Sequence, residues 1–267
     1  MHRFARLAWT ILVLVAALSA TVRAESPAPG DGLSWQGIRE EAFGQRPIAD
    51  GAAVMHLDAP ERAEDAAIVP ISIRLADGFA SGVKKLSIVI DENPSPIAAT
   101  FTYGEAAGAG ERIMATRIRV DRYTFVRAIA ETEDGKLYMT RAFVKASGGC
   151  SAPASRDIEE AQNSLGKMRI KTAVNGKQDL AEVAVRHPNI SGLAIDQLSG
   201  GYPPARFISK LTVSDGEKLI FSVEGGISIS EDPHFRFTYA GHSKDIFSVS
   251  AEDSIGTRFN GQSANSF

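Results

Sequence analysis

Cys150 is the side chain of this chain best suited to covalent chemistry, and it is the only cysteine among 267 residues. It stands in Ser147-Gly148-Gly149-Cys150-Ser151, between two blocks of β-type sequence. A single cysteine cannot form an intramolecular disulfide, so its thiol is available for oxidation or a mixed disulfide. Small residues on both sides predict a flexible arm, made of Ser147, Gly148, Gly149 and Ser151, that exposes the thiol. The alternative is a buried and inert cysteine, but such residues usually sit within apolar patterns.

A nucleophilic hydrolase would need a base beside this thiol. The candidates are four histidines, His56, His187, His234 and His242, which are scattered over predicted loops and strands. Sequence alone brings none of them to Cys150, and a Gly-Gly arm lacks the rigid support that a catalytic nucleophile needs. The histidines also have no metal-ligand spacing, so we predict neither a metal nor a cofactor.

The first 24 residues are typical of a secretory signal. Arg3 and Arg6 form a basic start, Trp9–Leu18 is a short apolar run, and Val22–Ala24 is a small-x-small cleavage site. The apolar run is shorter than the roughly 20 residues of a membrane-spanning helix, and no later segment is a candidate. The remaining 243 residues carry a formal charge of about −6, which argues against nucleic-acid binding. We therefore predict a periplasmic protein, where an unpaired cysteine indicates a reactive thiol or an intermolecular bond.

Alternating apolar residues predict an all-β chain with two sandwich domains. Clear examples are Val69–Leu75, Leu86–Ile90 and Phe207–Val213, and Asp215-Gly216 is typical of a hairpin turn. Ser34 is a candidate N-cap for a short helix that ends at Phe43. The predicted organisation is a signal at 1–24, a first sandwich at 33–146, the arm with a short linker helix at 147–166, and a second sandwich at 167–260.

Three segments of the first block resemble the SoxY sulfur carrier: Ala59–Ile71, Lys85–Phe101 and Thr116–Val120. The block closes with Gly148-Gly149-Cys150, where SoxY has its Gly-Gly-Cys carrier arm. The second block resembles SoxZ through Val185–Pro188, Pro204–Ile208, Asp215-Gly216 and Asp232–Phe237. A single chain with both halves is similar to the quinoprotein dehydrogenase-associated SoxYZ-like carrier family.

The resemblance implies two immunoglobulin-like β-sandwiches joined by a Gly-Cys linker and a short helix, in the periplasm. It also implies that Cys150 carries a sulfur compound covalently and that partner oxidoreductases act on it, as in thiosulfate oxidation. The partners would be of the cytochrome c type or a quinoprotein dehydrogenase, and the chain itself would not be an enzyme. The SoxY arm is a free C-terminal tail, whereas this chain continues through Ser151 and Pro153 into a second domain. An arm of about ten residues held at both ends extends its middle by about 17 Å at most, so we expect Cys150 to be presented locally.

Three functions remain open on the sequence. The leading hypothesis is a covalent thiol carrier with Cys150 as the attachment point. The second is an adaptor that docks on a dehydrogenase or cytochrome, with Cys150 incidental. The third, a thiol hydrolase or transferase, requires a histidine within hydrogen-bond reach of the sulfur.

Overall fold

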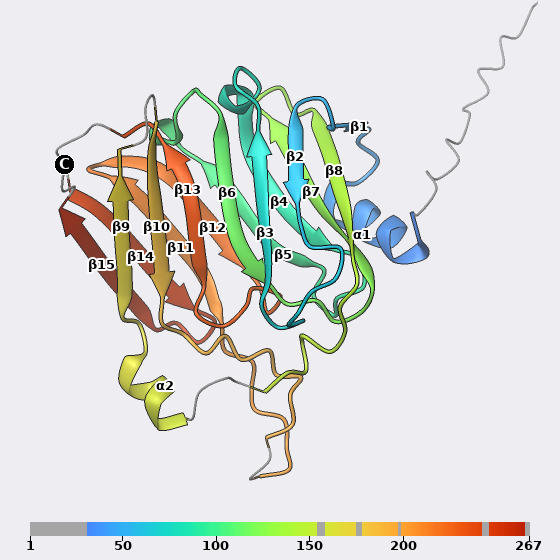
Figure 1. Cartoon of the computed structure of the whole chain (residues 1–267), viewed down its shortest axis with the longest axis vertical. Helices are drawn as coiled ribbons and strands as arrows, with labels where there is room; N and C mark the ends of the chain where they lie inside the picture. The colour runs from blue at the N-terminus through green and yellow to red at the C-terminus, as the bar shows by residue number, and fades with distance from the viewer. Residues whose placement is uncertain (1–30, 154–157, 175–177, 197–198, 242–245, 265–267) are drawn as a thin grey trace, which may run out of the picture.

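A computed structural model describes residues 31–153, 158–174, 178–196, 199–241 and 246–264. The predicted signal at 1–24 lies outside these residues, so its assignment stays a prediction. The all-β prediction is confirmed, since two sheets face each other and form a two-layer sandwich (Figure 1). Within the described residues no helix is long and apolar enough to cross a membrane.

Within its described part, residues 31–146, the first half contains one helix, eight strands and two short 3-10 helices. These are α1 (Leu33–Phe43), β1 (Ile48–Asp50), β2 (Met55–Asp58), β3 (Val69–Leu75), η1 (Ala80–Gly82), β4 (Val83–Ile90), β5 (Ile97–Tyr103), η2 (Glu105–Ala107), β6 (Arg112–Ile118), β7 (Thr124–Thr132) and β8 (Leu137–Val144).

The second half begins after the Cys150 segment. It contains α2 (Ile158–Ser164), β9 (Met168–Ala173), β10 (Asp179–Val185), β11 (Ile208–Asp215), β12 (Lys218–Gly225), β13 (His234–Tyr239), β14 (Ile246–Asp253) and β15 (Arg258–Ala264).

Both sheets run through both halves of the chain. The larger sheet has nine strands in the order β1-β8-β7-β4-β5-β12-β11-β14-β15, and the smaller has six in the order β2-β3-β6-β13-β10-β9. The halves join by antiparallel pairing of β5 with β12 in one sheet and of β6 with β13 in the other. Four strands that would otherwise be sheet edges, two from each half, therefore satisfy their backbone hydrogen bonds across the junction.

One hydrophobic core extends across this junction. Phe101 of the first half packs edge-to-face against Phe221 and Phe235 of the second half, with ring centroids 5.6 and 5.8 Å apart. Such aromatic pairs add about 0.5–1.5 kcal/mol each beyond the burial of their area. The two sandwich halves consequently pack directly against each other, a contact that the prediction of two sandwiches joined by a Gly-Cys linker and a short helix did not include.

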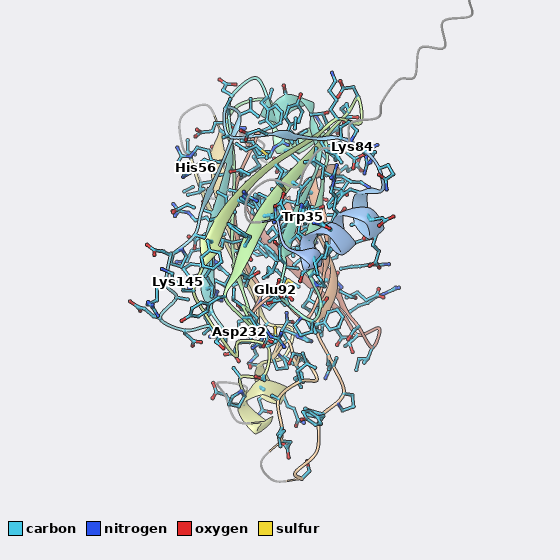
Figure 2. The ribbon with its side chains drawn as sticks, turned by 90° about the vertical axis from the view of Figure 1, so that its right-hand side faces the viewer. Trp35, His56, Lys84, Glu92, Lys145 and Asp232 are labelled. Atoms are coloured by element: carbon cyan, nitrogen blue, oxygen red, sulfur yellow. The ribbon has the colours of Figure 1, made fainter. Side chains whose placement is uncertain are left out.

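A smaller core lies outside the larger sheet, under α1. Trp35 and Phe43 of the helix pack against Val89, Ile129 and Leu137 of the sheet (Figure 2 labels Trp35). The helix is where the sequence predicts it, but its N-cap is Gly32 and no side chain caps it, so the prediction of Ser34 as the cap was wrong.

Candidate functional site

The segment 147–151 crosses the lower end of the sandwich in Figure 1, after β8 and before α2. Ser147 and Ser151 are exposed and Gly148 is half-buried, whereas Gly149 and Cys150 are buried. The Cys150 residue has 0% of its surface exposed to solvent. The expectation of an exposed thiol was therefore wrong for this conformation.

Main-chain hydrogen bonds fix this segment on the end of β6. Gly148 N donates to Asp121 O at 2.8 Å, and Gly149 N donates to Val120 O at 3.0 Å. A Cβ on Gly149 would lie 2.0 Å from Ala66 O and 2.7 Å from Val120 O. Only glycine allows so close an approach, because any side chain would meet backbone that has no room to yield. The Gly-Gly pair thus lets the segment dock tightly in this conformation, and the flexibility of the arm stays a prediction.

Two side chains, one from each half of the chain, donate hydrogen bonds to main-chain oxygens of the segment. Arg119, which follows β6, donates to Gly149 O at 3.2 Å. Ser191, in the loop between β10 and β11, donates from Oγ to Cys150 O at 2.5 Å. The two residues that cover the segment are therefore 30 and 41 positions away from their partners in the sequence. Their contacts explain how a cysteine with small polar neighbours becomes buried.

The covering loop is itself fixed by a buried polar network. Arg119 also donates to Asn189 O at 3.2 Å, and the Asn189 side chain contacts His187 Nδ1 at 2.8 Å. Asn189 Oδ1 accepts from Ile208 N at 3.1 Å, which ties the loop to the start of β11. Asn189 has φ of +41°, an unusual conformation that asparagine tolerates better than most residues. The site is thus built from both halves of the chain.

Burial sets the protonation state of the thiol. The pKa of Cys150 is raised to about 12, first by loss of solvent and then by Asp121, while Arg119 opposes both. Thiolates are the nucleophilic form, so in the docked conformation Cys150 is a protonated and unreactive thiol at neutral pH. Cys150 is not a member of either hydrophobic core cluster, so its burial depends on the covering loop and on the docked segment.

The histidines are distributed over three places. His56 is exposed on β2, His234 lies on β13, and His242 is outside the described residues. His187 is buried, its pKa is lowered by that burial, and its Nε2 lies 3.7 Å from Asp253 Oδ2. Among the described residues no histidine is hydrogen-bonded to Cys150, and no cluster of three or more His, Cys, Asp or Glu side chains could hold a metal ion. Among the described histidines, none is placed as the base that the thiol-hydrolase hypothesis requires.

Sequence reasoning missed Arg119, Asn189 and Ser191 as the residues that hold the thiol. A signal for Arg119 and Asn189 was present in the segments that carried the family resemblance. Arg119 lies within Thr116–Val120, and Asn189 directly follows Val185–Pro188. Nothing in the local pattern around Ser191 pointed to Cys150.

Comparison with protein families gives two matches along the chain. Residues 39–150 match the sulfur oxidation protein SoxY, and residues 168–264 match the sulphur oxidation protein SoxZ. The SoxY match ends at Cys150 itself. Comparison with curated proteins found no match.

Solved structures give weaker likenesses. The sulfur carrier protein SoxY from Chlorobium limicola f thiosulfatophilum is 25% identical, with a TM-score of 0.33, over 41% of this chain and 89% of that one. A β-glycosidase from Bacteroides vulgatus is 8% identical, with a TM-score of 0.24, over 79% of this chain and 24% of that one. At these TM-scores neither likeness supports an inference about function. The family matches do identify the organisation: one polypeptide joins a segment that matches SoxY to a segment that matches SoxZ.

Proposed function

We propose that this chain is a periplasmic carrier that holds a sulfur-containing group covalently on Cys150 and presents it to partner oxidoreductases. The observation that carries the proposal is the SoxY match, which ends on the only thiol of the chain. Domains of two sulfur oxidation proteins support a carrier role in sulfur oxidation, with the chemistry supplied by partner enzymes.

The covalent step needs an electron acceptor. When the Cys150 thiol joins the outer sulfur of thiosulfate, the S–H bond breaks and an S–S bond forms, with release of one proton and two electrons. The proton goes to solvent and the electrons go to a partner redox protein, of the cytochrome c or quinoprotein type. Later hydrolysis by a partner would release the oxidised sulfur and leave sulfur on Cys150.

Loading requires the segment 147–151 to leave its docked position. The docked thiol is buried and its pKa is about 12, so a partner active site cannot use it as it stands. Undocking breaks the bonds to Asp121, Val120, Arg119 and Ser191 and returns the thiol to solvent. Because the segment is held at both ends, an undocked Cys150 would be presented near the lower end of the sandwich.

An adaptor is the second candidate, and the burial of Cys150 is the observation that favours it. In that role the chain would dock on a dehydrogenase or cytochrome and the thiol would only pack. The two candidates differ in one respect that can be measured, namely whether Cys150 is modified in the cell.

Intact-mass spectrometry of the protein isolated from its native periplasm tests the proposal. We expect mass increments of one sulfur atom or one thiosulfate group that disappear with reductant and are absent from Cys150→Ser. The control Ser151→Ala alters the neighbouring exposed residue and should keep the increments. An unmodified thiol in active cells, with full sulfur or alcohol oxidation in Cys150→Ser, would leave only the adaptor. The same spectrum gives the mature N-terminus, and a start at Glu25 would support export.

A further inference from the structure

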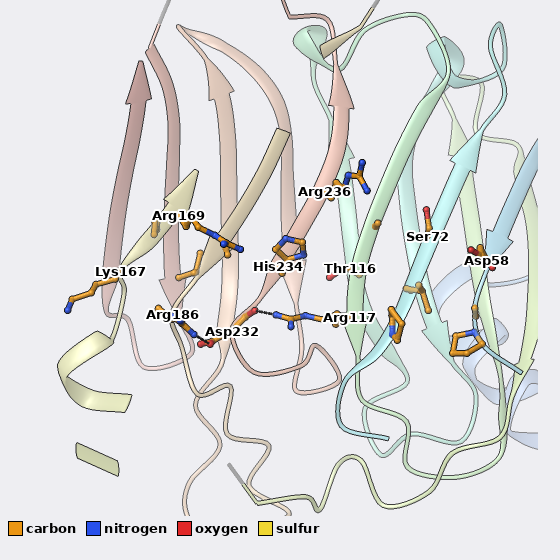
Figure 3. Close-up of a pocket in the computed structure, with 18 of the residues that line it drawn as sticks. Asp58, Ser72, Thr116, Arg117, Lys167, Arg169, Arg186, Asp232, His234 and Arg236 are labelled. Carbon is orange, nitrogen blue, oxygen red and sulfur yellow. Dashed lines mark hydrogen bonds and ion pairs between the residues drawn. The ribbon is translucent and has the colours of Figure 1, made fainter. Parts of the chain in front are cut away.

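A second feature of the molecule lies on the outer face of the six-stranded sheet. A groove of about 1130 Å³ crosses this face, and residues of all six strands line it (Figure 3). Six basic side chains surround it, and we call it the basic groove: Arg117, Lys167, Arg169, Arg186, His234 and Arg236. Its floor is made of small or apolar residues such as Ala115 and Ala184, so the cationic groups stand around an open surface.

The charge of the groove contrasts with that of the protein. Five of its side chains are lysine or arginine, and its carboxylates are Asp58 and Asp232. The pKa of His234 is lowered, first by burial and then by Arg117, so this histidine is neutral at pH 7. The groove therefore has a net positive charge on a chain whose predicted mature form is acidic. Clustered cations on an acidic protein attract anionic partners and guide their approach.

Part of this charge is not neutralised within the protein. Arg186 pairs with Asp232, and Arg236 is 3.8 Å from Glu182. Lys167 and Arg169, at the β9 end, have no side-chain ion pair with a described residue, and Nε of Arg117 is buried without a hydrogen-bond partner there. These groups can bind an added anion without first giving up an acidic neighbour.

The dimensions of the groove favour a polypeptide over a small anion. Strands lie about 4.8 Å apart, so six strands span about 24 Å, which an extended segment of about seven residues would cross. A single oxoanion would contact only one or two of these cations. We propose that the basic groove is a docking surface for an acidic, extended segment of a partner protein.

The groove also adjoins the loop that covers Cys150. Asp232 Oδ2 accepts from Arg186, and its main-chain oxygen accepts from Arg117 at 2.9 Å. Its Oδ1 accepts from His187 N at 3.0 Å, at the start of the covering loop. A partner held in the groove would therefore lie beside the covering loop. The docking surface does not depend on what Cys150 carries.

The test uses fluorescence anisotropy with the whole mature chain and a fluorescein-labelled peptide of alternating Glu and Ala residues. We expect binding that weakens as salt rises, because salt screens exposed charges. The double variant Lys167→Glu/Arg169→Glu should weaken binding at least tenfold. Arg258→Glu, which reverses an exposed arginine on β15 of the other sheet, should leave it unchanged. Melting temperatures of both variants separate lost binding from lost folding.

Several results would overturn the inference. They are equal binding of a peptide with Gln in place of Glu, equal weakening by Arg258→Glu, or no binding at low salt. Displacement of the peptide by millimolar sulfate, but not by chloride of equal ionic strength, would assign the groove to small oxoanions instead. Cys150→Ser should bind the peptide as the parent chain does, so failure of the carrier proposal would not affect this result.

Discussion

Two buried arginines of the first half, Arg127 and Arg119, show how differently two neighbouring sites are held. Arg127 lies under α1, with its guanidinium 4.1 Å from the Trp35 ring and bonded to Asp91 at 2.7–3.0 Å. Asp31 lies 2.8 Å away on the same guanidinium. Arg119 lies under the Cys150 segment, and its hydrogen bonds go to the main-chain oxygens of Gly149 and Asn189.

The difference lies in what compensates each charge. The charge of Arg127 is balanced by two carboxylates, and its guanidinium also contacts an aromatic ring. These interactions hold the arginine stably in the core. Arg119 has only carbonyl acceptors among the described residues, and its Nε has no hydrogen-bond partner. Burial lowers the pKa of Arg119, which reflects this incomplete compensation. Both acceptors of Arg119 belong to loops, so the bonds can break without disturbing a sheet. The comparison indicates a rigid site around Arg127 and a segment around Arg119 that can undock.

The largest expected effect is at the Arg127 site. Arg127→Ala leaves Asp91 buried without a cation, whereas Asp31 keeps its ion pair with Arg141, so we expect the free energy of unfolding to fall by about 3–5 kcal/mol. Urea denaturation measures this change. Arg258→Ala, at an exposed pair, should change it by less than about 1 kcal/mol. If Arg127→Ala changed stability no more than this control, the contrast between the Arg127 and Arg119 sites would be lost.

The next largest effect is expected in the docked segment 147–151. Gly149→Ala places a Cβ against the main-chain oxygens of Ala66 and Val120, so the segment cannot stay docked. We expect the thiol of Cys150 to react with iodoacetamide at least about tenfold faster, since a clash of this kind costs more than the 1.4 kcal/mol that a tenfold change requires. Gly37→Ala is the control, because nothing lies within 4 Å of a Cβ at Gly37. An unchanged rate would mean that the segment does not need this close approach.

A smaller effect is expected from the covering loop. Ser191→Ala removes the hydrogen bond to Cys150 O, and one such bond is worth about 1 kcal/mol, so alkylation should accelerate about fivefold. Ser81→Ala, a distant exposed serine, should have no effect on the rate. Acceleration by Ser191→Ala beyond that of Gly149→Ala would place the main restraint in the loop instead of in the glycine contact.

The smallest effect at ordinary pH comes from ionisation of the thiol. The folded pKa of Cys150, about 12, lies above its reference value of 9.0, so the docked form keeps its proton more tightly than the open form. Stabilisation by the docked thiol is full below pH 9 and is lost as pH rises from 9 towards 12. Protection from alkylation, as the ratio of rates in unfolded and folded protein, should stay constant below pH 9 and fall above it. Protection that did not change up to pH 11 would show that the thiol is not buried in solution.

Much of this protein could be predicted from its sequence, since the evidence was local. Alternation in segments such as Val69–Leu75 follows from the two faces of a strand, and the all-β fold is confirmed. Cys150 stood out as the one thiol, and the Gly-Gly pair stood out beside it. Their role as a carrier site remains a proposal.

Other features were decided only by tertiary structure. The pattern of a strand reports which face is buried but not whether its edge pairs with another strand, so the joining of β5 to β12 could not be foreseen. Small polar neighbours predicted an exposed Cys150, yet burial is set by Ala66, Val120 and Ser191, which are distant in sequence. The basic groove likewise gathers Arg117, Arg169 and Arg236 from separate strands. The sequence determines the chemical groups that each residue offers. The solvent exposure of those groups and the side chains around them depend on contacts that only the folded chain makes.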